Sequence, residues 1–272
     1  MDEANISFRK EFGQNFLINK MVPEDIADNC TDISESLVLE IGPGIGCLTQ
    51  ELAMRYKKVL AVEIDKGLIP VLDKTLSEFD NVTVLNEDIM ESDIRSLINQ
   101  YSDGMPVSVC ANLPYYITTP ILMRLLECGA KFKTITIMVQ NEVAARLVAK
   151  PGSSDYGAIT AVLGYYGNAK KLFKVPASAF MPAPKVDSAV VRIDLYDTKR
   201  YVPKNEKLFR ELIRASFEMR RKTLVNATSS KLPHINKEKI ANSLISLGFK
   251  ADVRGEKLST EDFVNLSNLL CD

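Results

Sequence analysis

The chain has 272 residues, of which 46% are hydrophobic and 25% are charged. These values are typical of globular domains and exclude a disordered or fibrous protein. The sequence contains no apolar run of the roughly 18 residues that a membrane span needs, and its polar, acidic first residues do not resemble a signal peptide. We therefore expect a cytoplasmic protein of about two domains that makes no contact with a membrane.

Cysteine and histidine usage narrows the possible chemistry. The five cysteines are scattered and form no C-x-x-C pair, which predicts reduced thiols and neither a disulfide framework nor a zinc site. The only histidine, His234, lies between Pro233 and Ile235, where nothing marks it as a ligand or a base. Mechanisms that need a bound metal or several imidazoles are therefore disfavoured.

Apolar periodicity predicts an α/β fold in the first two thirds of the chain. From residue 37 to residue 193, short β-branched or apolar runs alternate with longer amphipathic stretches, as in β-α-β units. The expected strands are Leu37–Ile41, Val59–Glu63, Val82–Leu85, Val107–Ala111, Thr134–Val139, Lys171–Val175 and Ser188–Ile193. Because residues 176–187 are short and rich in proline, we expect the last two strands to form an antiparallel hairpin at the edge of a mostly parallel, seven-stranded sheet.

The pattern of apolar residues changes after Tyr196. Apolar residues recur at helical spacing in residues 208–217, 237–247 and 259–269, and residues 196–205 read as a polar linker. We therefore predict a catalytic domain at 1–195 and a small all-helical domain at 196–272. The first carries 19 lysines and arginines against 25 acids, and the second 15 against 10. The basic balance of the second domain fits a polyanionic partner or, equally well, a solvated helical surface.

A glycine-rich turn follows the first expected strand. Glycines 42, 44 and 46 give the spacing G-x-G-x-G, and a helical stretch begins at Leu48. Such a turn lets the backbone come close to a ligand. The dinucleotide fingerprint G-x-G-x-x-G would need its last glycine where Cys47 stands, so the spacing argues against a pyrophosphate binder.

Two acidic residues end the next strands. Glu63 follows Gly42 by 21 positions and is placed to accept hydrogen bonds from ribose hydroxyls, and Asp88 follows the third strand, where it suits an adenine amino group. Alone, each acid would read as a solvated loop residue. Together with the glycine turn, they favour S-adenosylmethionine as the cofactor, with NAD as the alternative.

The fourth expected strand ends in Asn112-Leu113-Pro114-Tyr115. The Asn112 side-chain oxygen and the Leu113 carbonyl form a neutral acceptor pair that can hold the two N–H groups of an adenine amine and favour a pyramidal nitrogen. Pro114 stiffens the turn, and Tyr115 offers a face on which a base can stack. This turn resembles the active site of class I methyltransferases that modify exocyclic amino groups. Cys110, two residues earlier, reads as a core side chain rather than a nucleophile.

Several further motifs carry a family resemblance over nearly the whole chain. They are residues 11–17 (EFGQNFL), 40–46 (EIGPGIG), 112–117 (NLPYYI), 138–144 (MVQNEVA), 156–157 (YG) and 180–190 (FMPAPKVDSAV). Together they resemble the ribosomal RNA adenine N6-dimethyltransferase family in its bacterial small-subunit form. The resemblance implies a Rossmann-like, S-adenosylmethionine-dependent enzyme that dimethylates two adjacent adenosines near the 3′ end of 16S rRNA during assembly of the small ribosomal subunit.

The resemblance also implies roles for single residues. Asn15 and Leu17 would cover the cofactor, and Gly42 and Gly44 would line its methionine part. Glu63 would hold the cofactor ribose and Asp88 the cofactor adenine. Asn112 would bridge the cofactor and the target amine. Phe180 would stack on the target base opposite Tyr115; without the family pattern a core phenylalanine is as good an interpretation. A basic helix ending in Arg220, Arg221 and Lys222 would contact RNA phosphates. Asn141 departs from the family pattern, where a lysine is expected.

Three alternatives stay open at this point. The first is a large-subunit rRNA methylase of the kind that confers macrolide resistance, from which the residues 180–190 and Leu113 differ. The second is an assembly or transcription factor that keeps the fold without the chemistry, against which the intact residues 112–115 argue. The third is an NAD oxidoreductase. A monomer is the default oligomeric state.

Overall fold

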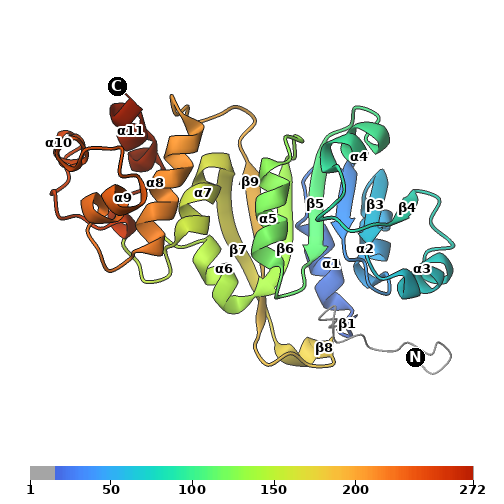
Figure 1. Cartoon of the computed structure of the whole chain (residues 1–272). Coiled ribbons are helices and arrows are strands. Elements are labelled where there is room, and N and C mark those ends of the chain that lie inside the picture. The colour runs from blue at the N-terminus through green and yellow to red at the C-terminus, as the bar shows by residue number, and fades with distance from the viewer. Residues whose placement is uncertain (1–15, 272) are drawn as a thin grey trace. The chain divides into compact units, whose positions relative to one another are not determined.

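The computed structural model describes residues 16–271, which form two compact units (Figure 1). The sheet unit comprises the residues up to Ala144 together with Lys170–Leu195. The helical unit comprises Ala145–Ala169 and the residues from Tyr196 onward. The predicted boundary after residue 195 coincides with one of these divisions, but residues 145–169 belong with the C-terminal helices, which the sequence pattern did not indicate.

The sheet unit is built on one seven-stranded sheet with the order β4-β3-β2-β5-β6-β9-β7. Its strands are β2 (Leu37–Ile41), β3 (Lys58–Glu63), β4 (Val82–Asn86), β5 (Val107–Asn112), β6 (Thr134–Gln140), β7 (Gly167–Val175) and β9 (Ser188–Leu195). The pairs β2·β3, β2·β5, β3·β4 and β5·β6 are parallel, and β9 runs antiparallel to β6. The predicted fold class is therefore confirmed, and β7 with its neighbour β9 ends the sheet as expected.

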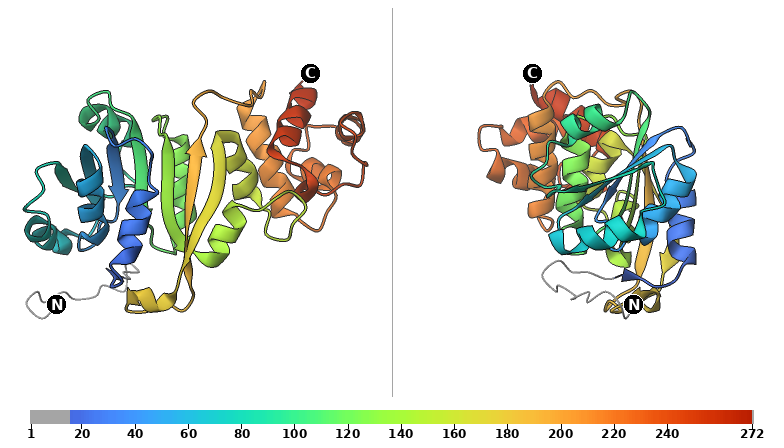
Figure 2. Two further views of the ribbon diagram at one scale, coloured as in Figure 1. Left: turned by 180° about the vertical axis from the view of Figure 1, so that it is seen from behind. Right: turned by 90° about the vertical axis from the view of Figure 1, so that its right-hand side faces the viewer.

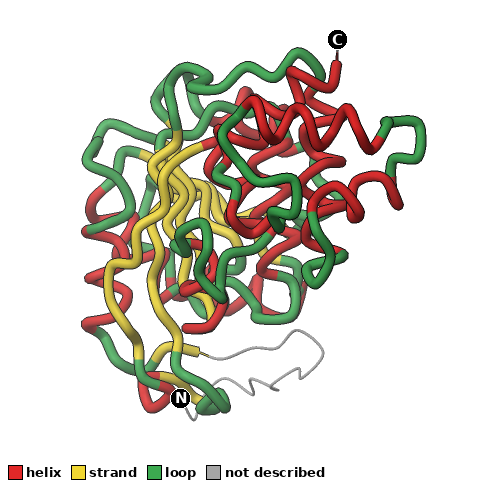
Figure 3. Tube along the Cα trace, turned by 90° about the vertical axis from the view of Figure 1, so that its left-hand side faces the viewer, coloured by secondary structure: helices red, strands yellow, loops and turns green. Residues whose placement is uncertain are grey.

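The central strands read as continuous apolar runs because both faces of the sheet are covered. All five residues of β2 are buried, as are the last five of β3 and the first five of β5. Figure 2 shows helices on both faces of the sheet, and Figure 3 shows the strands as one twisted layer. The helices that begin in this unit are α1 (Met21–Asp28), α2 (Cys47–Arg55), α3 (Ile69–Thr75), α4 (Ile94–Tyr101), α5 (Thr118–Glu127) and α6 (Asn141–Leu147).

A second, two-stranded sheet joins distant segments. β1 (Phe16–Leu17) pairs antiparallel with β8 (Phe180–Met181), so that Leu17 faces Phe180. The Ile18 amide adds a hydrogen bond of 2.9 Å to the Ala179 carbonyl. This pairing fastens the proline-rich segment between β7 and β9 to the first described residues.

The helical unit consists of α7 (Ala158–Tyr166), α8 (Glu206–Glu218), α9 (Leu224–Lys231), α10 (Lys237–Ser246) and α11 (Thr260–Cys271). Helix α7 packs against α8 and α11, which explains why residues 145–169 join this unit. One tie between them is the Thr260 hydroxyl, which donates to the Ala161 carbonyl at 2.8 Å. Asn205 ends the predicted linker and caps α8, because its side chain accepts from the Leu208 amide at 3.0 Å.

Candidate active site

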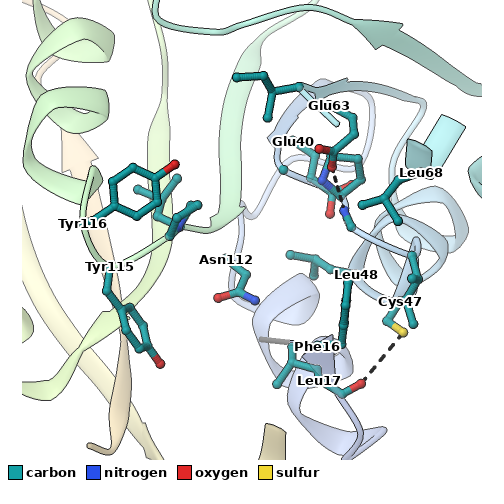
Figure 4. A pocket seen from close by; sticks show the side chains of 17 residues that line it. Phe16, Leu17, Glu40, Cys47, Leu48, Glu63, Leu68, Asn112, Tyr115 and Tyr116 are labelled. Carbon is teal, nitrogen blue, oxygen red and sulfur yellow. Dashed lines mark hydrogen bonds between the residues drawn. The ribbon is translucent and has the colours of Figure 1, made fainter. Parts of the chain in front are cut away.

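A pocket lies at the carboxyl ends of β2, β3 and β5 (Figure 4). After β2 the chain builds β3 and β4 on one side of that strand and then β5 on its other side, so this edge is the topological switch point at which open α/β sheets bind ligands. The lining residues are Phe16, Leu17, Glu40, Gly42, Pro43, Gly44, Ile45, Cys47, Leu48, Glu63, Ile64, Leu68, Asn112, Leu113, Pro114, Tyr115 and Tyr116.

The glycine turn forms one wall of this pocket. Gly42 and Gly44 have φ angles of +69° and +62°, a left-handed conformation that side chains disfavour. A Cβ atom added to Gly42 would meet no atom within 4 Å, so this position opens onto free space. Gly44 lies against the ring of Phe16. The turn therefore presents bare backbone to a ligand, as the spacing predicted.

Glu63 links the end of β3 to the glycine turn. Its carboxylate is only 4% exposed and accepts hydrogen bonds from the Gly44 amide at 3.1 Å and the Asp65 amide at 2.8 Å. Burial raises the pKa of Glu63, and the two amide donors oppose that shift. Because each carboxylate oxygen has two lone pairs, Glu63 keeps acceptor capacity for two ribose hydroxyls while it holds the turn.

Glu40 is a pocket residue to which the sequence reasoning gave no role. Its side chain is 1% exposed, and Oε2 has no hydrogen-bond partner in the described part of the chain. Desolvation raises the pKa of Glu40 to about 8, and the negative charge of Glu63 adds to the shift. Interaction with the Thr49 side chain opposes this shift. A buried carboxyl group with an unpaired oxygen beside a glycine turn is complementary to a cationic ligand, and the sulfonium and ammonium groups of S-adenosylmethionine meet that requirement. The residues present thus fit this cofactor.

The turn after β5 forms the opposite wall. The Leu113 amide donates to the Met138 carbonyl at 3.2 Å, and the Pro114 carbonyl accepts from the Ile117 amide at 3.2 Å and the Thr118 hydroxyl at 3.1 Å. The Leu113 side chain is buried and anchors the turn in the core. These bonds hold the backbone of the turn without using the side chain of Asn112.

Asn112 and Tyr115 differ in how they are held. Within residues 16–271, the side-chain amide of Asn112 has no hydrogen-bond partner. Asn112 lines the pocket and is only partly exposed. The Tyr115 hydroxyl is hydrogen-bonded to the buried Ser188 hydroxyl at 2.7 Å, and burial raises the pKa of Tyr115. Asn112 therefore keeps a free oxygen and a free amino group for a ligand, whereas the Tyr115 ring is tethered at its far end.

The structure brings most of the predicted cofactor and catalytic residues together. Those that line the pocket are Leu17, Gly42, Gly44, Glu63, Asn112, Leu113, Pro114 and Tyr115. Asn15 lies outside the described residues. Asp88 does not line the pocket; it is partly buried, and its Oδ1 accepts from the Met90 amide at 2.8 Å. Cys110 is fully buried, and burial raises the pKa of its thiol, in agreement with a core role.

The role of Phe180 as a second stacking face stays a prediction. Phe180 is 3% exposed, belongs to the same buried cluster as Leu17, and does not line the pocket. The reason is the pairing of β8 with β1, which turns this ring into the core. The burial of this ring also fits the alternative interpretation of a core phenylalanine. Tyr116, which the sequence reasoning passed over, lines the pocket and is 64% exposed.

The predicted RNA-contacting residues lie after α8 in the helical unit. Helix α8 ends at Glu218, so Arg220, Arg221 and Lys222 are in the following turn rather than on a helix. The Arg220 guanidinium donates to the Ser154 carbonyl at 3.0 Å and the Tyr156 carbonyl at 3.2 Å. All three residues are exposed, but the Arg220 guanidinium is engaged within its own unit.

Three further observations concern the rest of the chain. Over residues 16–271, no group of three or more histidine, cysteine or acidic side chains is placed to hold a metal ion. None of the helices in that range combines the length and apolar character needed to cross a bilayer. In the sheet unit, the side chain of Asn141 accepts a hydrogen bond from Lys171 Nζ at 2.6 Å, so this departure from the family pattern has a partner of its own.

The chain is similar to known proteins over nearly its whole length. The chain is 48% identical to "Ribosomal RNA small subunit methyltransferase A" of Lachnoclostridium phytofermentans, over 97% of this chain and 91% of that protein. It is 45% identical to the protein of the same name from Bacillus pumilus, over 99% of this chain and 94% of that one.

Two solved structures share the fold at nearly full length. A dimethyladenosine transferase from Plasmodium falciparum has a TM-score of 0.78 at 27% identity, covering 92% of this chain and 95% of that chain. The 23S rRNA methyltransferase ErmE has a TM-score of 0.72 at 25% identity, covering 95% and 100%. The family model described as ribosomal RNA adenine dimethylase matches residues 5–272. The chain therefore belongs to the ribosomal RNA adenine dimethylase family and is a methyltransferase.

Proposed function

We propose that this protein transfers methyl groups from S-adenosylmethionine to the N6 atoms of two adjacent adenosines in the 3′-terminal hairpin of 16S rRNA, within the small ribosomal subunit during its biogenesis. The observation that carries this proposal is the side-chain amide of Asn112, which has no hydrogen-bond partner within residues 16–271. It lies in a pocket that also contains the glycine turn and Glu63. The names of the relatives from L. phytofermentans and B. pumilus support the choice of the small subunit. We further propose that the protein acts as a cytoplasmic monomer.

The proposed cofactor site uses the two sides of the glycine turn. Glu63 would hold the ribose hydroxyls with its remaining lone pairs, and Gly42 would leave room for the methionine part. Glu40 would face the positive charge of the cofactor, and Leu17 would cover it. Asp88 and Asn15 would complete the adenine and N-terminal contacts. S-adenosylmethionine supplies an electrophilic methyl carbon.

The proposed chemistry is the positioning of a weak nucleophile. An adenine amine is a poor nucleophile because its lone pair is delocalised into the ring. The Asn112 oxygen and the Leu113 carbonyl would accept the two N–H groups and so favour a pyramidal nitrogen whose lone pair is free. After the first transfer one N–H remains, so one acceptor suffices for the second. No strong base is needed, because the methylated ammonium that forms first loses its proton readily to water.

The target base also has to leave its helical stack. The Tyr115 ring, tethered through its hydroxyl to Ser188, would supply one stacking face for the extruded base. The exposed Arg221 and Lys222 would contribute phosphate contacts, which give salt-dependent affinity without sequence choice. Arg220 has a smaller part in this proposal, because its guanidinium is already bound to two main-chain carbonyls.

Transfer of tritiated methyl groups onto undermethylated small subunits tests the proposal. We expect label in the small subunit and a primer-extension stop at the paired adenosines of the 3′-terminal hairpin. A parallel reaction with naked 16S rRNA reports how much of the assembled subunit the enzyme requires. No label in small subunits under conditions in which a small-subunit dimethyltransferase is active would refute the proposal.

A second candidate is a large-subunit methylase, favoured by the structural likeness to the 23S rRNA methyltransferase ErmE. Disruption of the gene separates the two. Loss of methylation only in large-subunit RNA would establish the second candidate, whereas loss at the small-subunit hairpin establishes the first.

A further inference from the structure

Tyr115 and Tyr116 are consecutive residues that line the same pocket under different constraints. Tyr115 is partly buried and bound to Ser188. Tyr116 is 64% exposed, and within the described chain its hydroxyl has no hydrogen-bond partner. Figure 4 shows both rings on one side of Asn112, with Glu63 on the other. The Tyr115 ring is thus fixed by the protein, whereas the Tyr116 ring is free to contact a ligand that enters the pocket.

The fold does not explain the aromatic ring at position 116. The turn is closed by hydrogen bonds from the Ile117 amide and the Thr118 hydroxyl to the Pro114 carbonyl. At the start of α5, the Ile121 amide donates to the Ile117 carbonyl. None of these bonds involves the Tyr116 side chain. An aromatic side chain contributes 150–250 Å² of surface when it is covered, in proteins generally. Because Tyr116 lines the pocket and most of its surface is in water, its ring is available to a ligand that enters there.

The proposed reaction defines what the ligand is. Extruding one adenosine breaks its stacking with the next nucleotide, which remains attached through a single phosphodiester. The base of that next nucleotide is therefore held near the mouth of the pocket with one π-face exposed. A tyrosine ring is a sequence-tolerant partner for such a face, because every nucleobase can stack on it.

We propose that Tyr116 is the stacking platform for the nucleobase adjacent to the target adenosine. This inference rests on the proposed function, and it adds a second base-binding position to the single slot at Asn112 and Tyr115. With two adjacent adenosines as substrates, one base occupies the slot while the other occupies the platform. The platform then holds the RNA near the site between the two rounds of modification.

Steady-state methylation of undermethylated small subunits by the Tyr116→Ala and Tyr116→Phe variants tests the platform. A base–aromatic stack is worth about 1–3 kcal/mol, which corresponds to an increase of roughly five- to 150-fold in the KM for small subunits. We expect this increase in Tyr116→Ala with kcat and cofactor affinity unchanged, and wild-type values in Tyr116→Phe, which keeps the ring. Met54→Ala is the matched control, because Met54 is 60% exposed on α2 and does not line the pocket.

A modified substrate tests the partner of the platform. In small subunits that carry an abasic nucleotide next to the remaining target adenosine, the wild-type enzyme should show the raised KM, and Tyr116→Ala should show no additional increase. The substitution is made on the 5′ and the 3′ side in turn, and one of the two must reproduce the effect.

Several outcomes would overturn the inference. One is an unchanged KM for Tyr116→Ala, and another is a defect of Tyr116→Phe as large as that of Tyr116→Ala, since the hydroxyl rather than the ring would then matter. Weakened binding of S-adenosylmethionine, measured by calorimetry, would assign Tyr116 to the cofactor instead. Independent losses from Tyr116→Ala and the abasic nucleotides would also contradict it. If the wild-type enzyme does not methylate small subunits at all, the proposed function fails before the platform is tested.

Discussion

The two walls of the pocket are built in opposite ways. On the glycine-turn wall, the Glu63 carboxylate is buried and bound to two backbone amides, so the groups that would hold a cofactor are already ordered. On the other wall, the side chain of Asn112 has no hydrogen-bond partner among the described residues, and Tyr116 is largely exposed. The comparison teaches that one side is organised in advance for a small molecule, whereas the other awaits hydrogen bonds and stacking from the substrate.

Among the tests of this difference between the two walls, replacement of Asn112 has the largest expected effect on activity. Asn112→Ala removes the side-chain acceptor for the target amine, and loss of one hydrogen-bonding group that stabilises a transition state lowers kcat by roughly 100- to 1,000-fold. Because the Asn112 side chain has no hydrogen-bond partner within residues 16–271, the thermal midpoint of the variant should differ little from that of the wild type. Binding to small subunits should also persist.

The exposed Asn99 on α4 supplies the matched control, Asn99→Ala, which should keep full activity. Methyl transfer and subunit binding are measured on the same preparations. Full activity in Asn112→Ala would remove the proposed role, and joint loss of activity and subunit binding would favour a structural role instead.

Replacing Glu63 tests the preorganised wall. Glu63→Ala removes the acceptor of the Gly44 and Asp65 amides together with the proposed ribose contact. Hydrogen bonds to charged groups contribute about 1.5–3 kcal/mol each, so we expect cofactor affinity to fall by roughly 10- to 150-fold and the thermal midpoint to decrease. Calorimetric titration with S-adenosylmethionine measures the first, with the exposed Glu78→Ala as control. Unchanged affinity would exclude Glu63 from the cofactor site.

The raised pKa of Glu40 predicts a pH dependence on the same wall. Burial raises the pKa of Glu40 from 4.5 to about 8, so between these values the folded protein retains a proton that the unfolded chain releases. The free energy of unfolding should therefore fall as the pH rises from about 4.5 to about 8. In Glu40→Gln this contribution should be absent, and the variant should gain stability relative to the wild type as the pH increases.

The same group links cofactor binding to proton release. A cationic ligand favours the ionised form of Glu40, so binding of S-adenosylmethionine at neutral pH should release up to one proton from this carboxyl group. Calorimetry in buffers of different ionisation enthalpy measures the release, and Glu40→Gln should reduce it. Equal proton release by the two proteins would show that Glu40 does not face the bound cation.

The smallest expected effect concerns the tether of Tyr115. Breaking its hydrogen bond to Ser188 by Tyr115→Phe or Ser188→Ala should lower kcat/KM by a few-fold, because a neutral hydrogen bond contributes about 1 kcal/mol. If the two hydroxyls act only through each other, the double variant should be no worse than either single variant. Additive losses in the double-mutant cycle would contradict the tether.

Local sequence patterns were sufficient for the backbone of the sheet unit. The predicted first strand matches β2, and most of the others differ from the observed strands by one or two residues; β7 begins four residues earlier, at Gly167. The convergence of Gly42, Glu63 and Asn112 was also predictable. Strand ends at the same edge of a parallel sheet meet wherever the intervening loops are short, so spacing along the chain carries this information.

Exposure and pairing were decided by tertiary contacts. Phe180 and Tyr116 are both aromatic residues near the proposed site. Pairing of β8 with β1 buries the first, whereas the second is 64% exposed among residues 16–271. Arg220 and Arg221 are adjacent arginines, but only Arg220 reaches the carbonyls of Ser154 and Tyr156.

The sequence by itself therefore determined the fold class, the glycine turn and the Asn112 turn. The tertiary structure alone decided which aromatic side chain is exposed at the pocket, which buried carboxyl group keeps an oxygen without a partner among the described residues, and which residues join the helical unit. The physical reason is that backbone geometry follows from local spacing, whereas burial depends on segments that are far apart in the chain and meet only when it folds.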